Sequence, residues 1–442
     1  MLLPYKITDD KKIIYVSNGY VNYLAEIHKE IIQNQISILN YKAYEDIGSN
    51  FDFSDNPIEE IIYETSILSC NDDKYQKQNF NNLPVKLQTL KLDLTYVECY
   101  KLDNLPSELK KLYLPNSYCF ELDNLPLGLE KLSLLIGDDF IQSLCYLPES
   151  LKELTIRSFK SAKILNINYD NLPNGLEKLF LYGNIDCELN NLPRNLKTLH
   201  LTEIYNNMIH NLPDGLEELK IPIDYKYLRE IFSSINTLKK LIAGFNNNSH
   251  SPQVLSSFDL ESIPNSVEEI IFGDNFNQKI TYLPKEVKKI TFGFNYNQPI
   301  SSGDLPDSIE YLEFGYNFNN TISKYPSNLK ILKFGRNYSS KIENLPDGLV
   351  ELEINERFNN KLSNLQETLE ILRFDEYGEY SHLDKLELPN SIKILQFGKY
   401  QKQMSIKNIP KSLEYIKYSK SNEKITKLIE ETGWIGKIEY WT

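Results

Sequence analysis

Apolar residues return along most of this chain in a fixed pattern that starts from the dipeptide Leu-Pro. Four residues after the anchor leucine comes an aliphatic residue, followed by another at seven and an aliphatic or aromatic one at nine, as in Leu283, Val287, Ile290 and Phe292. The last two alternate with other positions, which is the period of a short strand with one buried face. Because proline fixes its own φ and keeps its predecessor out of the α region, the dipeptide predicts an extended turn leading into the strand.

The pattern repeats, and successive anchors lie mostly 20 or 22 residues apart. This period falls within the range of leucine-rich repeats, about 20–29 residues. A unit this short cannot bury its apolar stripe alone, so neighbouring units must stack. We therefore expect a leucine-rich-repeat-like solenoid, a curved parallel β-ribbon of about 17 short units with an irregular convex side. Its short strands are expected near residues 88–93, 110–114, 130–134 and so on through 414–418.

In the C-terminal half a second block, Phe-Gly-X-Asn-aromatic, follows each strand at residues 272–276, 292–296, 314–318 and 334–338. The shared glycine predicts a tight exit from the strand, where a residue without Cβ is favoured. The shared asparagine is expected to stack as a ladder whose side-chain amides satisfy backbone groups of the loop. The final aromatic residues predict a spine inside the coil, closed by an aliphatic residue four positions later: Phe276, Tyr296, Phe318, Tyr338 and Phe358, with Ile280, Ile300, Ile322, Ile342 and Leu362.

These blocks resemble the FNIP repeat, a relative of the leucine-rich repeat that is named for its Phe-Asn-Ile-Pro letters. The resemblance covers roughly residues 54–418, although an early unit such as 181–189 keeps the outline without the aromatic residue. The family is abundant in social amoebae and giant DNA viruses. The unpaired cysteines predict a cytoplasmic protein, which the resemblance would place in the host cytoplasm or the virion if it is viral.

The two ends depart from the repeat. Residues 1–53 predict two strands around Asp9 and Asp10, followed by a helix, which suits an N-terminal cap or a small α/β module. This opening is also loosely similar to the start of the BTB and Skp1-like fold, so an adaptor-binding module stays open. Residues 419–442 predict a C-terminal cap in which Ser421 begins a helix, Gly433 ends it and a last strand follows. The segment between them, 54–418, is the solenoid.

Composition narrows the function classes. The formal charge of −13 argues against sequence-independent binding to nucleic acid, because such binding relies on lysine and arginine to neutralise phosphates. Five cysteines without a CxxC pair argue against a disulfide scaffold or zinc site, and no cofactor or metal is expected. The N-terminus is not expected to be a signal peptide, and no apolar stretch is long enough to span a membrane. The five histidines are scattered and no catalytic motif is present, so we do not expect an enzyme.

The remaining hypothesis is a binding surface. If the residues at seven and nine point inward, the one between them points onto the concave face. Bulky groups at or near this position identify the candidate partner-binding residues Tyr113, Phe180, Tyr182, His200, Ile242 and Ile271. We expect a non-catalytic scaffold that binds a partner protein, including as the substrate-recognition subunit of a ubiquitin ligase. The alternative is a structural component of a virion or surface layer. The sequence leaves the partner's identity and the oligomeric state open.

Overall fold

The fold was analysed in a computed structural model of the chain. It divides into two compact units, unit 1 over Met1–Leu216 and unit 2 over Glu217–Thr442. The structure describes residues 5–441 except 9–12, 17–26, 28, 33–34, 36, 44–56, 67–82, 96–101, 116–117, 119, 137–143, 145, 159–168, 170, 184–187, 203, 245–257, 356, 359, 363–364, 379–385 and 400–404. All five cysteines lie outside the described residues, as does the polar segment 245–252, whose sequence suggests a protruding loop.

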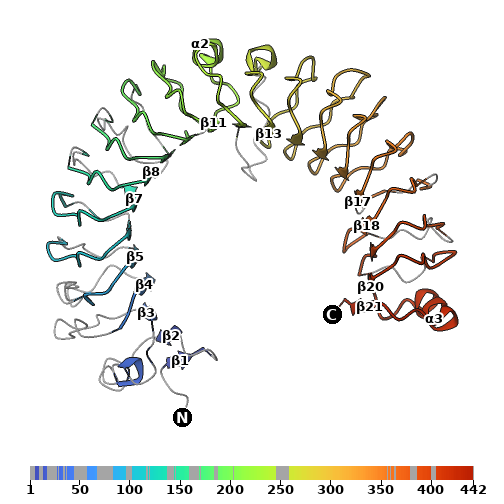
Figure 1. The fold of residues 1–442 in the computed structure, drawn as a ribbon, viewed down its shortest axis with the longest axis horizontal. Helices are drawn as coiled ribbons and strands as arrows, with labels where there is room; N and C mark the ends of the chain where they lie inside the picture. Colours follow the sequence, from blue (N-terminus) through green and yellow to red (C-terminus); the bar gives the residue numbers. More distant parts are fainter. Residues whose placement is uncertain are drawn as a thin grey trace. The chain divides into compact units, whose positions relative to one another are not determined.

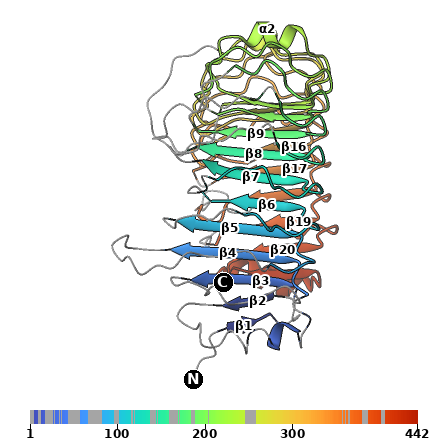
Figure 2. The same ribbon diagram turned by 90° about the vertical axis from the view of Figure 1, so that its left-hand side faces the viewer.

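Unit 1 is a ladder of short strands. The first two strands pair antiparallel, and each later strand pairs in parallel with the one before it, as Figure 2 shows for β3 to β9. The strands are β1 (Tyr5–Ile7), β2 (Ile13–Val16), β3 (Ile38–Ala43), β4 (Glu60–Ser66), β5 (Thr89–Thr95), β6 (Lys111–Leu114), β7 (Lys131–Ile136), β8 (Glu153–Ser158), β9 (Lys178–Tyr182) and β10 (Thr198–His200).

Unit 2 continues the same plan with eleven strands, all paired in parallel with their neighbours. In each unit the strands line the inner edge of the coils, and in unit 2 the helices lie at the outer edge (Figure 1). The elements are β11 (Glu218–Ile221), α2 (Leu228–Ser233), β12 (Lys240–Ala243), η2 (Leu260–Ser262), β13 (Glu269–Phe272), β14 (Lys289–Thr291), β15 (Tyr311–Glu313), β16 (Ile331–Lys333), β17 (Glu351–Ile354), β18 (Ile371–Phe374), β19 (Ile394–Gln396), β20 (Tyr415–Tyr418), α3 (Glu423–Thr432) and β21 (Lys437–Tyr440).

The predicted repeat is confirmed, with one strand for each expected unit from β4 to β20. In a typical unit, Val287 and Ile290 are fully buried and Phe292 is 2% exposed, so the apolar residues at four, seven and nine all enter the coil. The anchor proline has a further role. Its carbonyl accepts the amide of the residue three positions later, as from Val287 to Pro284 at 3.3 Å, which closes a β-turn before each strand.

The aromatic spine in unit 2 is also confirmed. Phe276, Tyr296, Phe318, Tyr338 and Phe358 are at most 2% exposed. Each ring of the first four stacks on the phenylalanine four residues before it, with centroids 3.8–4.0 Å apart, and these four spine rings follow one another at 5.7–6.0 Å. A double column of rings therefore fills the coil from residue 272 to residue 338.

The structure confirms the residue without Cβ and the asparagine ladder of the Phe-Gly-X-Asn block, and it corrects the physical role of each. The glycines do not adopt positive φ; a Cβ on Gly293, Gly315 or Gly335 would collide with the backbone of the preceding turn, so the requirement is close stacking of coils. The asparagines of the block bond to one another, with Asn317 donating to Asn295 at 3.0 Å. The loop backbone is instead satisfied two residues later, where Asn319 Oδ1 accepts the amide of Ser339 at 2.9 Å.

The ends follow the expected order of elements with local differences. The hairpin of β1 and β2 forms, but Ile38 belongs to β3 and not to the preceding helix. Helix α3 is capped by the side chain of Asn422, which accepts the Ile425 amide at 3.1 Å, and not by Ser421. Gly433 ends it in the left-handed conformation, as expected. The domain boundaries after residues 53 and 418 follow the sequence pattern and stay predictions.

Candidate protein-binding face

The strand ladder produces a surface on which side chains lie in columns, because successive residues of a strand point to opposite sides. We call the outward positions the strand face. In unit 1, register places Phe180 beside Thr155 on one side and His200 on the other. In unit 2, Ile242 pairs with Ile271, and Glu313 pairs with Lys333. The columns expected from the sequence are therefore formed within each unit.

Three of the candidate residues form one cluster in unit 1. The rings of His200 and Phe180 lie nearly perpendicular, with 4.8 Å between centroids and an interplanar angle of 84°. Tyr182 lies nearly parallel to Phe180 at 6.4 Å, and its hydroxyl is 3.2 Å from His200 Nδ1. The guanidinium of Arg157 lies over the ring of Tyr182 at 5.2 Å. Edge-to-face and cation–π contacts of this kind each contribute about 0.5–1.5 kcal/mol beyond burial, so the cluster is organised before any partner arrives.

Tyr113 lies on the same strand face but apart from this cluster, on β6, with β7 and β8 between it and β9. Lys131 sits over its ring at 5.5 Å and pairs with Glu153 at 2.7 Å. Burial opposes the charge of Lys131, but the hydrogen bond and charge of Glu153 outweigh it and raise the pKa of this ammonium group. Tyr113 and Lys131 therefore form a second group on the strand face of unit 1, and this group contains a cation.

Ile242 and Ile271 are the candidates that lie in unit 2, side by side on β12 and β13 and only partly exposed. The flanking positions on these strands are charged: Lys240 lies 3.8 Å from Glu269, which also pairs with Lys289 at 2.9 Å. The two isoleucines are thus a small apolar spot bordered by an ion-paired row.

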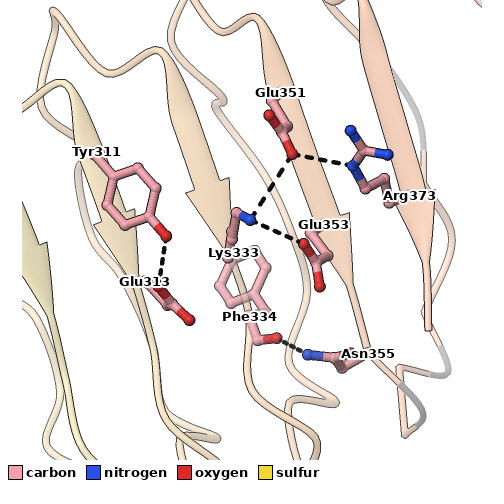
Figure 3. Close-up of polar contacts among 8 residues, drawn as sticks. All are labelled: Tyr311, Glu313, Lys333, Phe334, Glu351, Glu353, Asn355 and Arg373. Atoms are coloured by element: carbon pink, nitrogen blue, oxygen red, sulfur yellow. Dashed lines mark hydrogen bonds and ion pairs between the residues drawn. The ribbon is translucent and has the colours of Figure 1, made fainter. Parts of the chain in front are cut away.

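Further along unit 2 the strand face is a network of paired charges (Figure 3). The carboxylate of Glu351 receives Arg373 Nε at 3.1 Å and lies 3.9 Å from Lys333 Nζ, while Lys333 also pairs with Glu353 at 3.3 Å. Tyr311 donates to Glu313 at 2.5 Å, and burial together with this carboxylate raises the pKa of Tyr311 well above its usual value. Every charge drawn in this network has an opposite charge or a hydroxyl beside it.

The sequence prediction considered only the residue eight after the anchor. It did not include a second outward column, formed by the residue six after the anchor. In unit 2 this column carries apolar groups at β15, β16, β18, β19 and β20, all partly exposed: Tyr311, Ile331, Ile371, Ile394 and Tyr415. The signal was present in the sequence, because strand alternation sends positions six and eight to the same side. The same column in unit 1 carries the charged residues Lys111, Lys131, Glu153 and Lys178.

Among the described residues, no group of histidine, cysteine, aspartate and glutamate side chains has the arrangement to hold a metal ion. No helix in the described part of the chain is both long and apolar enough to cross a membrane.

Comparisons with known proteins agree with this architecture. The FNIP repeat model matches residues 256–295, 296–325, 325–357 and 381–421. A crystal structure described as CroV588, a novel circular leucine-rich-repeat protein, is 25% identical, with a TM-score of 0.61 over 94% of this chain and 67% of the other. YopM from Yersinia enterocolitica is 20% identical, with a TM-score of 0.40 over 87% of this chain and 85% of the other. A search of curated proteins gave no match. The chain carries FNIP repeats within a parallel β-solenoid of the leucine-rich-repeat type.

Proposed function

We propose that this protein is a scaffold that binds a partner protein on the strand face of unit 1, with Phe180, Tyr182 and His200 as the anchor. Leucine-rich-repeat-like solenoids are typical protein–protein interaction scaffolds. The observation that carries the proposal is the half-buried aromatic cluster, whose three rings and one guanidinium hold one another in place. Rigid aromatic groups beside arginine are the most frequent anchors of protein interfaces.

The ion-paired face of unit 2 supports the choice of unit 1. Glu351, Lys333 and Arg373 already satisfy one another, so a partner there would have to compete with existing pairs. Ile242 and Ile271 offer less apolar surface than the aromatic cluster, and we propose them as a secondary contact. The ubiquitin-ligase and virion roles stay predictions, because no contact in the described residues favours either one.

The experiment is affinity capture with matched variants. The full-length protein, the pair Phe180→Ala/Tyr182→Ala and the pair Ile242→Ser/Ile271→Ser are immobilised, and proteins retained from a lysate of the source cells are compared. We expect a partner that is retained by the wild type and by the isoleucine pair but lost from the aromatic pair. Equal retention by all three proteins, with unchanged melting temperatures, contradicts the proposed site.

A further inference from the structure

Between β6 and β10 the strand face of unit 1 carries an excess of positive charge, on a protein whose formal charge is −13. From β6 to β10 its outward positions hold four cations, Lys111, Lys131, Arg157 and Lys178, and one carboxylate, Glu153. Three of the cations, Lys111, Lys131 and Lys178, open their strands. Arg157 lies later on β8, beside Tyr182.

The excess is not neutralised within the described part of the chain. Lys131 takes the single carboxylate, Glu153, at 2.7 Å. Arg157 lies over the ring of Tyr182 and has no carboxylate partner among the described residues. Lys111 and Lys178 are exposed, and neither forms an ion pair with a described side chain. Three positive charges therefore face solvent beside a preformed aromatic anchor.

Several cations elsewhere in the described residues have a carboxylate partner. On the flank of unit 1, immediately before the strands, Lys110 and Lys197 lie 3.6 and 3.2 Å from Glu130 and Glu177. On the strand face of unit 2, Lys417 lies 2.7 Å from Glu439, and Lys333 and Arg373 share Glu351. Within the described part of the chain, the unpaired Lys111, Arg157 and Lys178 on the unit 1 face therefore contrast with the paired Lys333, Arg373 and Lys417 on the unit 2 face.

We propose that the partner engages unit 1 through an acidic protein segment, whose carboxylates pair with Lys111, Arg157 and Lys178 while an apolar or aromatic side chain packs on Phe180 and Tyr182. This rests on the proposed function and gives its partner a chemistry. β6 and β9 are three strand spacings apart, about 14 Å. About four residues of extended chain cover that distance, so acidic residues spaced by three or four positions match the lysines.

A protein segment fits this surface better than a nucleic acid does. The whole-chain charge of −13 repels a long polyanion, whereas a short acidic segment meets only the local cations.

The test uses the full chain and three fluorescein-labelled probes followed by anisotropy. The probes are a peptide of glutamates interrupted by regularly spaced tyrosines, the same peptide with glutamine in place of glutamate, and an oligothymidylate. The variant is Lys111→Glu/Lys178→Glu. Its control, Lys86→Glu/Lys285→Glu, makes the same change of charge at exposed turn positions away from the strand face. All four lysines are exposed, and unchanged melting temperatures confirm folding.

We expect the glutamate–tyrosine peptide to bind the wild type and the control equally, and to lose about tenfold or more in affinity on Lys111→Glu/Lys178→Glu. The glutamine peptide should bind the wild type at least about tenfold more weakly than the glutamate peptide. Equal binding of the two peptides, or an undiminished affinity in the face variant, overturns the proposal. Tighter binding of the oligothymidylate overturns it in favour of a nucleic acid.

The two proposals fail in different ways. A captured partner that is lost from Phe180→Ala/Tyr182→Ala but fully retained by Lys111→Glu/Lys178→Glu leaves the binding function standing and overturns the acidic segment. A partner retained by both variants overturns the site itself.

Discussion

The rings of Phe314 and Phe318 stack within one turn of unit 2 with 3.8 Å between their centroids. Phe318 is fully buried and also stacks on Tyr296 and Tyr338 of the adjacent turns at 6.0 and 5.7 Å. One side chain therefore joins three successive coils, and in a repeat protein such nearest-neighbour contacts carry the stability.

We expect Phe318→Ala to lower the free energy of unfolding by about 3–5 kcal/mol, as large truncations in a packed core do. The measurement is a denaturant titration followed by circular dichroism. Tyr282→Ala is the control, because this tyrosine is 37% exposed and its loss should stay within about 0.5–1 kcal/mol. A loss below about 1 kcal/mol for Phe318→Ala would mean that the ring is not part of the core.

Two tyrosines of the spine differ only in the fate of their hydroxyl groups. Tyr338 donates to the Lys341 carbonyl at 3.1 Å, whereas the buried hydroxyl of Tyr296 has no hydrogen-bond partner among the described residues. Tyr296→Phe should therefore be neutral or raise the free energy of unfolding by about 1 kcal/mol. Tyr338→Phe should lower it by about the same amount. Equal effects of the two substitutions in denaturant titrations would contradict the assignment.

The same tyrosines predict a loss of stability in alkali. Burial raises the pKa of Tyr338 to about 12. Because the folded pKa exceeds the unfolded value of about 10, the group's contribution is complete below pH 10 and is lost as pH rises toward 12. Between these limits Tyr338→Phe should reduce the pH dependence by about 1.4 kcal/mol per pH unit. Titrations at a series of pH values check this, and a slope identical to that of the wild type would refute it.

Much of this fold follows from the phase of the repeat. The repeat period is near 20 residues, and the residues seven and nine after each anchor point inward. Together these define the strand, its register and its outward column, so the sequence predicts Phe180 and His200 as neighbours. The helix α2 was missed although Leu228, Ile231 and Phe232 have helical spacing and are buried. It is short and lies between two repeats, where the irregular spacing of the Leu-Pro anchors is a stronger signal than the helical spacing of three residues.

Other features depend on side-chain direction, which spacing alone does not give. The expected ladder of Asn317 and its equivalents forms, but only the structure shows that Asn319, and not the ladder, bonds to the loop backbone. The cationic character of the unit 1 face was missed for a different reason. The cations lie mainly in the column of Lys111 and Lys178, six residues after the anchor, whereas the prediction considered the column eight residues after it. The negative total charge of the chain also conceals this local excess.

The asparagine assignment gives a further prediction. Asn317 donates to Asn295 and accepts from Asn337, at 3.0 and 2.9 Å, in a partly buried row. Asn317→Ala leaves both neighbours without this partner, so it should cost about 1–3 kcal/mol. Asn319→Ala removes an acceptor at an exposed site, where water replaces it, and should cost less. Thermal unfolding of the two variants checks which one is less stable. A larger loss of stability for Asn319→Ala than for Asn317→Ala would contradict this prediction.

The contrast between the two strand faces can be tested by making one resemble the other. Glu351 and Glu353 neutralise Lys333 and Arg373 on unit 2, and the side chain of Glu351 is only 14% exposed. The pair Glu351→Gln/Glu353→Gln keeps shape and hydrogen-bonding capacity but leaves the two cations without carboxylates. If unpaired cations beside apolar groups are what attract an acidic segment, this face should then bind the glutamate–tyrosine peptide, because Ile331 and Ile371 lie in the neighbouring column.

Combining this pair with Lys111→Glu/Lys178→Glu isolates the new site from the one on unit 1. Anisotropy should show binding that is absent from the Lys111→Glu/Lys178→Glu protein alone, and that weakens steeply when salt is raised, since exposed charges are screened beyond about 10 Å at 0.1 M. No gain in the combined variant would show that charge without the ring cluster of Phe180, Tyr182 and His200 is insufficient. Affinity would then depend on the aromatic anchor, and the lysines would serve to select among partners that it can hold.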